Sequence, residues 1–308
     1  MDQNAVDEMV ATLHGAGVNF FDHSEAYGGS NRGAPEVMFG NAVRKLGIKR
    51  SDLVVSSKIF NHYNNVGLGP NEIGLSRKHL REGMEGILER LEMDYVDVVS
   101  AHRPDHLTPI EETVRGFNWL IDHGHALYWG TSNWTAQQLT EANEVAKRLD
   151  MVGPIAEQPP YSSAHPLDLS ARTAAFALFR LCLSHQLGSL SFSLPPVVLS
   201  RTFVEDEYMP IYDQYGLGIM CYSPLAGGVL TGKYSALASE QADATSRYNR
   251  RGNLPTEQIE TADKLRPFCE ELGCEMAHLA LAWALANPNI STLIAGATKL
   301  SQFESNMK

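Results

Sequence analysis

Short apolar segments alternate with longer amphipathic segments along most of this chain, and this alternation limits the fold more than any other feature. The segments typical of strands are Val18–Asp22, Leu53–Ile59, Val96–His102, Ala126–Asn133, Pro154–Gln158, Leu217–Pro224 and Ser291–Ala297. Apolar residues at three- and four-residue spacing predict helices over Ala5–His14, Pro35–Leu46, Arg77–Leu91, Ile110–Ile121, Ala136–Leu149 and Met276–Ala286. Strands that alternate with helices predict βαβ units and a parallel sheet that is covered on both faces.

The number of predicted strands favours a (β/α)8 barrel, also called a TIM barrel. Seven strand-like segments are close to the eight strands of that fold. A doubly wound sheet has the same alternation, but it usually carries a glycine-rich fingerprint after an early strand. The segment Gly28–Gly33 does not have the spacing of that fingerprint. We therefore expect an α/β protein in which residues 1–308 form a single TIM-barrel domain.

The alternation is incomplete at the ends and is interrupted in the middle. A helix-like segment comes first, and a last helix begins near Ser301, so we expect a barrel that lacks its first strand and its C-terminal helices. Residues 163–200 follow neither periodicity, and from Ser163 to Val204 there is one acidic residue, Asp168, and no lysine. We interpret residues 163–200 as an atypical insertion. The alternatives are a surface loop or extra helix, a membrane-active hairpin too short to span a bilayer, and translated non-coding sequence such as a retained intron.

Composition excludes several classes of protein. The net charge of −11 argues against a general nucleic-acid binder or a protein that binds anionic membranes. The four cysteines, Cys182, Cys221, Cys269 and Cys274, have neither paired spacing nor the density of a disulfide scaffold, and we expect no metal site. The chain has no apolar run of the roughly 18 residues that a membrane span needs, and its first residues do not resemble a signal peptide. We expect a cytoplasmic protein without direct membrane insertion.

Polar or ionisable residues end most of the predicted strands. They are Asp22, Lys58, His102, Ser132–Asn133, Gln158 and Ser223. A single residue of this kind is more often a helix cap or a structural group than a ligand contact. In a barrel, however, the active site is built where the strands end. The recurrence of such residues at one face therefore indicates a functional site.

Asp22, Tyr27, Lys58 and His102 together suit the reduction of a carbonyl group. A free phenol has a pKa of about 10 and is a poor proton donor at neutral pH. A nearby ammonium lowers the pKa of a phenol, and a carboxylate keeps the ammonium charged and oriented. A histidine beside the phenol can orient the carbonyl or relay the proton. The hydride must come from a cofactor, because side chains cannot supply one.

Several motifs of the chain resemble those of the aldo-keto reductases. Phe20–Gly28 resembles the Asp/Tyr segment of that family, Ser56–Lys58 its lysine strand and Ala101–Asp105 its histidine strand. The pattern is closest to the branch that contains the potassium-channel β subunits and their plant and microbial relatives, in the segments Gly74–His79, Leu91–Asp97, Thr108–Arg115 and Tyr128–Ser132. The resemblance covers nearly the whole chain outside residues 163–200. It implies a (β/α)8 barrel that binds NADPH without a Rossmann motif.

The resemblance also implies roles for individual residues. Asp22, Tyr27, Lys58 and His102 match the catalytic tetrad, with Tyr27 as proton donor. The matching cofactor positions are Ser132, Asn133 and Gln158 for the nicotinamide carboxamide, Tyr222 for the nicotinamide ring, Ser223 and Leu225 for the pyrophosphate side, Lys233 and Arg247 near the phosphates, and Gly296, Thr298, Gln302 and Asn306 for the adenosine phosphate. Pro224 and Gly227, in the same segment as Ser223, also match cofactor-binding positions. A compact basic set of this kind suits a 2′-phosphate and so favours NADPH.

Two departures from the family pattern accompany the missing first strand. Ser305 stands where a glutamate is usual, and residues 163–200 separate two segments that the family joins within a few residues. Three functions follow from the sequence. The first is an NADPH-dependent reductase of small aldehydes or ketones, the second an NADPH-binding regulatory β subunit of a potassium channel, and the third an inactive truncated or mis-spliced member of the family. A homo-oligomer or a channel complex is compatible with each of the first two.

Overall fold

The computed structural model describes residues 2–61, 67–162, 202–235 and 256–307. The predicted insertion at residues 163–200 and the predicted phosphate contact Arg247 therefore lie outside the described residues. The chain divides into two compact units. The first unit is Met1–Gln158 with Pro210–Leu217, and the second is Pro159–Met209 with Gly218–Lys308.

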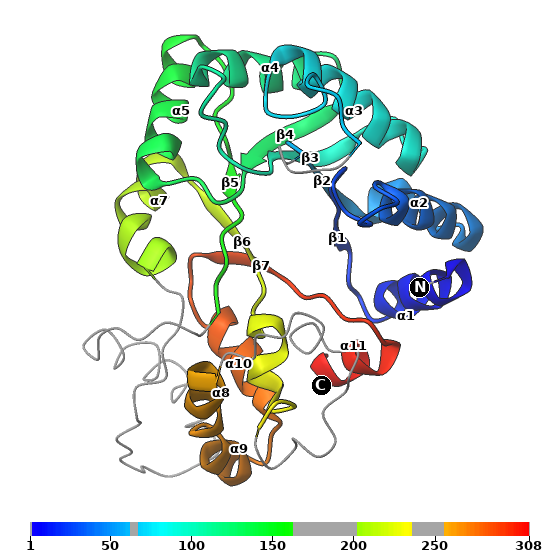
Figure 1. Ribbon diagram of the computed structural model, residues 1–308, viewed down its shortest axis with the longest axis vertical. Coiled ribbons are helices and arrows are strands. Elements are labelled where there is room, and N and C mark those ends of the chain that lie inside the picture. Colours follow the sequence, from blue (N-terminus) through cyan, green and yellow to red (C-terminus); the bar gives the residue numbers. More distant parts are fainter. Residues whose placement is uncertain (1, 62–66, 163–201, 236–255, 308) are drawn as a thin grey trace. The chain divides into compact units, whose positions relative to one another are not determined.

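The first unit contains parallel strands that follow one another in chain order (Figure 1). They are β1 (Phe20–Asp22), β2 (Val54–Ile59), β3 (Val96–Ala101), β4 (Ala126–Thr131) and β5 (Ala156–Glu157). Each strand pairs with the next one along the chain. A doubly wound sheet reverses its strand order at a switch point, and this unit has no such reversal. Its strand order is that of a (β/α)8 barrel.

Helices lie along the outer side of these strands, and most of them connect one strand to the next (Figure 1). They are α1 (Gln3–Gly15), α2 (Ala34–Leu46), α3 (Arg77–Leu91), α4 (Ile110–Asp122), α5 (Ala136–Arg148) and α7 (Met209–Tyr215), with the short 3-10 helix η1 at Arg50–Asp52. The helix α3 illustrates their patterning, because it buries Leu80, Met84 and Ile87 at three- and four-residue spacing. Its first turn is capped by the hydroxyl of Ser76, which accepts from the backbone N–H of His79.

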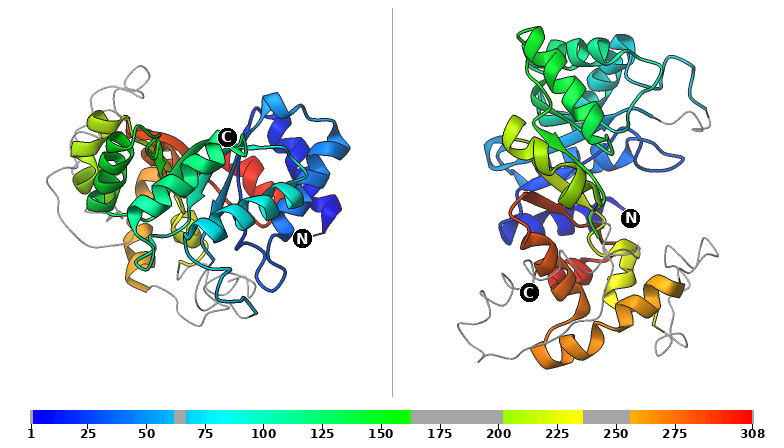
Figure 2. Two further views of the ribbon diagram at one scale, coloured as in Figure 1. Left: turned by 90° about the horizontal axis from the view of Figure 1, so that it is seen from above. Right: turned by 90° about the vertical axis from the view of Figure 1, so that its left-hand side faces the viewer.

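Close packing of the first helices sets the position of the strands that they flank. A side chain at Gly40 of α2 would place its Cβ 2.2 Å from the carbonyl oxygen of Leu91, at the end of α3, so this approach requires glycine. The helices α1 and α2 run side by side (Figure 2). They are joined by an ion pair of 2.6 Å between Lys45 and the buried Asp7.

The second unit contains two parallel strands and a group of short helices. The strands are β6 (Gly218–Tyr222) and β7 (Ile290–Ile294). The helices are η2 (Thr202–Glu207), η3 (Ala226–Thr231), α8 (Thr256–Asp263), α9 (Arg266–Leu272), α10 (Met276–Leu285) and α11 (Leu300–Asn306). An apolar core joins η3, α8, α9 and α10 through Val229, Leu230, Ala262, Cys269, Met276 and Leu279.

The α/β fold predicted from the sequence is confirmed, and the seven parallel strands of the described residues are consistent with an incomplete (β/α)8 barrel. Several strands end earlier than predicted. The predicted segments included Asn133 and Ser223, but both residues have a left-handed backbone, with φ of 60° and 56°. That conformation breaks a strand ladder, and Pro224 has no N–H to donate to one.

Over the described ranges, no helix is both long and apolar enough to cross a bilayer.

A buried ion pair between α2 and α3 gives a testable prediction of stability. The carboxylate of Glu36 is fully buried and accepts from Arg90 Nε and from Ser57 Oγ, each at 2.6 Å. Burial raises the pKa of Glu36, and the Arg90 charge opposes that rise. Arg90→Ala should lower the free energy of unfolding by about 2–4 kcal/mol, because it leaves a buried carboxyl group without its cation. Urea unfolding measures this change.

Lys78→Ala is the matched control. Lys78 pairs with Glu82 within the same helix, but both side chains are at least half exposed. An exposed pair of this kind contributes little, so the loss should stay within about 0.5 kcal/mol. If Arg90→Ala and Lys78→Ala lowered the free energy of unfolding equally, the buried pair would not contribute more than the exposed pair.

Candidate active site

The ammonium group of Lys58 lies at the centre of the site. Lys58 is on β2, and its side chain is 1% exposed. Its Nζ donates to the carboxylate of Asp22, to the carbonyl oxygen of His23 at 2.7 Å and to the hydroxyl of Tyr27 at 3.2 Å. An ammonium has three N–H donors, so these acceptors use all of them. The buried charge is held by one carboxylate and directed at one phenol.

The carboxylate of Asp22 is held by more than the ammonium. Its Oδ1 accepts from Ser56 Oγ and, at 3.1 Å, from Gln158 Nε2. Ser56 is the register partner of Asp22 in the β1–β2 pair. Side chains alternate along a strand, so Ser56 and Lys58 point to the same face of β2. One strand therefore supplies two of the groups that fix Asp22.

Tyr27 is positioned by the loop between β1 and α2. Its backbone N–H donates to the carbonyl oxygen of Ser24 at 3.0 Å. The next residue, Gly28, has φ of 109°, and a Cβ there would lie 2.1 Å from the carbonyl oxygen of Asn31. This tight turn therefore needs glycine. The Tyr27 side chain is partly exposed, and its hydroxyl accepts from Lys58 on the buried side.

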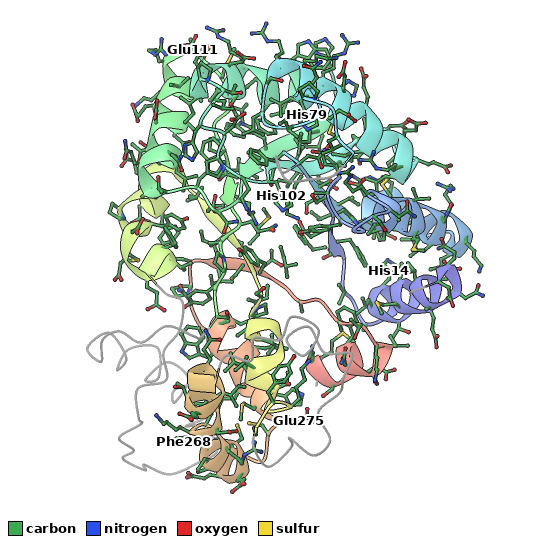
Figure 3. The ribbon with its side chains drawn as sticks, in the orientation of Figure 1. His14, His79, His102, Glu111, Phe268 and Glu275 are labelled. Carbon is green, nitrogen blue, oxygen red and sulfur yellow. The ribbon has the colours of Figure 1, made fainter. Side chains whose placement is uncertain are left out.

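His102 follows β3 (Figure 3), and its ring lies beside the phenol of Tyr27. The rings of His102 and Tyr27 meet edge to face, with centroids 5.7 Å apart and an interplanar angle of 83°. His102 Nδ1 is 3.0 Å from Ser24 Oγ, and the same hydroxyl oxygen accepts from the backbone N–H of Ala26 at 3.2 Å. Ser24 thus connects the imidazole to the loop that carries Tyr27. The structure brings together all four residues of the predicted tetrad.

The three predicted carboxamide contacts lie beside this group in the same unit. Ser132 Oγ donates to the carbonyl oxygen of Gln158 at 2.8 Å and accepts from Asn133 Nδ2 at 2.8 Å. Gln158 also donates to Asp22, so the amide group and the tetrad share a hydrogen bond. Hydroxyl and amide groups offer both donors and acceptors, which is what a carboxamide needs. These side chains fit the nicotinamide carboxamide of a dinucleotide cofactor.

The remaining predicted cofactor residues belong to the second unit. Tyr222 ends β6 and pairs with Ile294 at the end of β7, so the segments that follow the two strands leave from one edge. The turn after β6 contains Ser223, Pro224, Leu225 and Gly227, with left-handed backbone at Ser223 and Gly227. Lys233 Nζ lies 5.0 Å from the ring centroid of Tyr234, over that ring.

The segment after β7 leads into α11. Gln302 Oε1 accepts from the backbone N–H groups of Thr298 and Lys299, at 3.0 and 3.2 Å. Gly296 precedes this turn, and Asn306 is the last residue of α11. The structure therefore connects Thr298 and Gln302 through the start of α11, and their role at the adenosine phosphate stays a prediction. Among the described residues, no group of three or more His, Cys, Asp and Glu side chains is placed to hold a metal ion.

Sequence reasoning missed three polar residues that support the site. They are Ser24, Ser56 and Glu157. The signal for Ser56 was its position two residues before Lys58, which places both side chains on one face of a strand. Glu157 was an acidic residue inside a segment predicted to be a buried strand, and it immediately precedes Gln158. Ser24 gave no comparable signal, because serine in a loop is common.

Comparison with known proteins matches the chain to one family. The model of the Aldo/keto reductase family matches residues 1–308. A probable voltage-gated potassium channel subunit beta from Oryza sativa subsp. japonica is 46% identical over 312 residues, which cover 100% of this chain and 82% of that protein. A protein of the same name from Arabidopsis thaliana is 46% identical over 95% of this chain and 77% of its own length. A putative voltage-gated potassium channel subunit beta from Schizosaccharomyces pombe is 35% identical over 95% of this chain and 75% of its own length.

His23 makes the stability of the fold depend on pH. Its carbonyl oxygen accepts from Lys58, and its buried ring lies 4.6 Å from the ring of Phe39. Burial lowers the pKa of His23 to about 4, while the Asp22 charge raises this pKa and the Lys58 charge lowers it. An unfolded histidine titrates near pH 6.5. Between these values the unfolded chain binds more protons, so stability is lost as the pH falls.

His23→Gln should therefore lose less stability than the parent chain when the pH falls from about 7 to about 4. Thermal unfolding followed by circular dichroism measures the two melting temperatures at each pH. The difference between parent and variant isolates His23 from the other groups that titrate in acid. Parallel decreases in the two chains would show that His23 is not kept neutral by the fold.

Proposed function

The chain belongs to the aldo/keto reductase family, and on this premise we propose that it is an NADPH-dependent oxidoreductase that reduces the carbonyl group of small aldehydes or ketones. The observation that carries the proposal is the buried Lys58 ammonium with its three acceptors, one of which is the hydroxyl of Tyr27. A structural lysine would need no partly exposed phenol as a partner. A site that donates a proton to a carbonyl oxygen needs a phenol that the substrate can reach and an ammonium that stabilises the phenolate.

The proposed mechanism assigns one task to each side chain of the tetrad. Tyr27 gives its hydroxyl proton to the carbonyl oxygen of the substrate. Lys58 stabilises the phenolate that remains, because its ammonium is a donor to that oxygen. Asp22 keeps the ammonium charged and fixes its direction. His102 orients the carbonyl group beside the phenol.

Bound NADPH would supply the hydride to the carbonyl carbon. Ser132, Asn133 and Gln158 would hold its carboxamide through their hydroxyl and amide groups. The other proposed cofactor residues are those of the second unit, with Tyr222 at the nicotinamide ring, Ser223, Pro224, Leu225 and Gly227 at the pyrophosphate, Lys233 and Arg247 near the phosphates, and Gly296, Thr298, Gln302 and Asn306 at the adenosine phosphate. Cationic side chains at the phosphates favour NADPH over NADH, because the 2′-phosphate adds negative charge.

We further propose that residues 1–308 act as one barrel domain, with residues 163–200 as an insertion, and that the protein works in the cytoplasm. The tetrad and the carboxamide residues belong to one compact unit, and the other cofactor residues belong to the second.

Tyr27→Phe tests the proposed mechanism. The variant keeps the ring but loses the hydroxyl, so carbonyl-dependent oxidation of NADPH should fall by about 10²–10⁴-fold. The loss of absorbance of NADPH with benzaldehyde as substrate measures the rate. NADPH affinity, measured by quenching of protein fluorescence, should change little.

Tyr128→Phe is the matched control, because it removes the hydroxyl of an exposed tyrosine on β4. Its rate should equal that of the parent chain. A Tyr27→Phe rate within a few-fold of the parent rate would refute Tyr27 as the proton donor.

A second candidate function is a regulatory β subunit of a potassium channel. The observation that favours it is the 46% identity to two plant proteins that carry this name. The tetrad does not distinguish the two functions, because slow reduction of a carbonyl would use the same residues. Such a subunit would bind NADPH and a channel, and its turnover would be slow.

Two measurements separate the candidates. Fast multiple turnover by the isolated chain is expected of the reductase, and stable co-purification with a co-expressed plant voltage-gated potassium channel is expected of the subunit. An inactive member of the family would neither bind NADPH nor unfold cooperatively. Light scattering of the purified chain gives its oligomeric state in the same preparation.

A further inference from the structure

Glu157 is a fully buried carboxyl group next to the proposed carboxamide residues Asn133 and Gln158. It is the last residue of β5, opposite Thr131 at the end of β4, and it precedes Gln158. Glu157 Oε2 is hydrogen bonded to Thr131 Oγ. Glu157 Oε1 accepts from the backbone N–H of Trp134 at 3.3 Å, and the carboxyl group also accepts from the backbone N–H of Asn133.

These contacts span the turn that carries the proposed carboxamide residues. The turn runs from Thr131 through Ser132 and Asn133 to Trp134, and Asn133 has a left-handed backbone with φ of 60°. A non-glycine residue in this conformation persists only when its surroundings hold it. Two consecutive backbone N–H groups donate to one carboxyl group, which supplies that support.

The surroundings of Glu157 suit a neutral acid better than a carboxylate. Glu157 takes part in no ion pair within the described part of the chain. Burial raises the pKa of Glu157 to about 8 and outweighs the hydrogen bonds from Thr131 and from the backbone of Asn133 and Trp134, which lower this pKa. The charge of Arg103 lowers it less than these hydrogen bonds do. Arg103 NH1 itself donates to the carbonyl oxygen of His102 at 2.5 Å.

A protonated Glu157 completes a chain of hydrogen bonds. Thr131 Oγ1 donates to Glu157 Oε2 in the structure. Protonation would reverse this bond, so that the acid O–H donates to Thr131 and the threonine hydroxyl donates to the carbonyl oxygen of Ala156, 3.4 Å away. The other carboxyl oxygen stays an acceptor for the backbone N–H groups of Asn133 and Trp134. In the ionised form Thr131 must donate to the carboxylate instead, and the bond to Ala156 is lost.

We propose that Glu157, in its protonated form, is a positioning residue that fixes Ser132, Asn133 and Gln158 for the nicotinamide carboxamide. This inference rests on the proposed function, because it concerns the same cofactor site. Glu157 would raise the affinity for NADPH without touching NADPH, because it holds the residues that do. That affinity would decrease when Glu157 loses its proton.

Two substitutions separate the hydrogen bonds from the charge. In Glu157→Gln the amide Nε2 donates to Thr131 Oγ and the amide oxygen accepts from the backbone, so this variant imitates the protonated acid. In Glu157→Leu the volume is similar but all of these hydrogen bonds are lost. The dissociation constant for NADPH, measured by fluorescence quenching between about pH 6 and pH 9, is compared among the three chains.

The parent chain should lose affinity for NADPH as the pH rises through about 8. Glu157→Gln should bind within about threefold of the parent at neutral pH and should lack this decrease, whereas Glu157→Leu should bind at least about tenfold more weakly at every pH. The proposal is overturned if Glu157→Gln binds as weakly as Glu157→Leu, or if parent and Glu157→Gln have the same pH profile.

Thermal unfolding without cofactor gives an independent measurement. A carboxyl group with a raised pKa in the folded state stabilises the fold at low pH, and this stability is lost as the pH rises from about 4.5 to about 8. Glu157→Gln should lack this loss. Its melting temperature should therefore rise relative to that of the parent chain as the pH increases from about 4.5 to about 8. Failure of the parent chain to bind NADPH at any pH would refute the proposed function, and the melting temperatures would still decide whether Glu157 is a buried neutral acid.

Discussion

The site depends on the burial of one positive charge. An ammonium removed from water costs several kcal/mol unless acceptors replace the lost hydration. Lys58 meets this requirement with three acceptors that come from the end of β1 and the loop after it. The same requirement explains Ser56 and Gln158, which fix the Asp22 carboxylate in front of the ammonium. The positions of the phenol and of the amide group therefore follow from where the charge is held.

Hydrogen bonds to loops connect this centre to the ends of the other strands. Ser24 joins His102 to the loop that carries Tyr27, and Ser132 joins the end of β4 to Gln158. Each of these bonds is made by a small hydroxyl side chain close to the backbone, which loses little entropy when it is fixed. The strands supply the spacing between the groups, and the hydroxyl groups set their directions.

Sequence periodicity predicted the strand order and the bounds of helices such as α3 (Arg77–Leu91), because a buried apolar face recurs at a fixed spacing. It did not predict the short helices α7, α8 and α9. It also predicted that Asp22, Lys58 and His102 meet, because parallel strands end at one edge. It did not predict where β4 ends, since the left-handed turn at Asn133 is stabilised by Glu157, which is distant in the sequence. The two-residue strand β5 was also predicted too long. The backbone N–H of Gln158 donates to the carbonyl oxygen of Thr131, but the carbonyl oxygen of Gln158 accepts from the Ser132 side chain and not from a neighbouring strand.

The difference in exposure within the tetrad has a consequence for the supply of protons. The side chains of Lys58 and Asp22 are 1% and 5% exposed, whereas Tyr27 is 38% exposed. In a cycle of the proposed kind, the phenol would be the side chain through which a proton returns from water, because it is the partly exposed one of these three side chains. The charge that drives the chemistry can therefore stay sealed from solvent while the proton that it mobilises is exchanged with the bulk on every turnover.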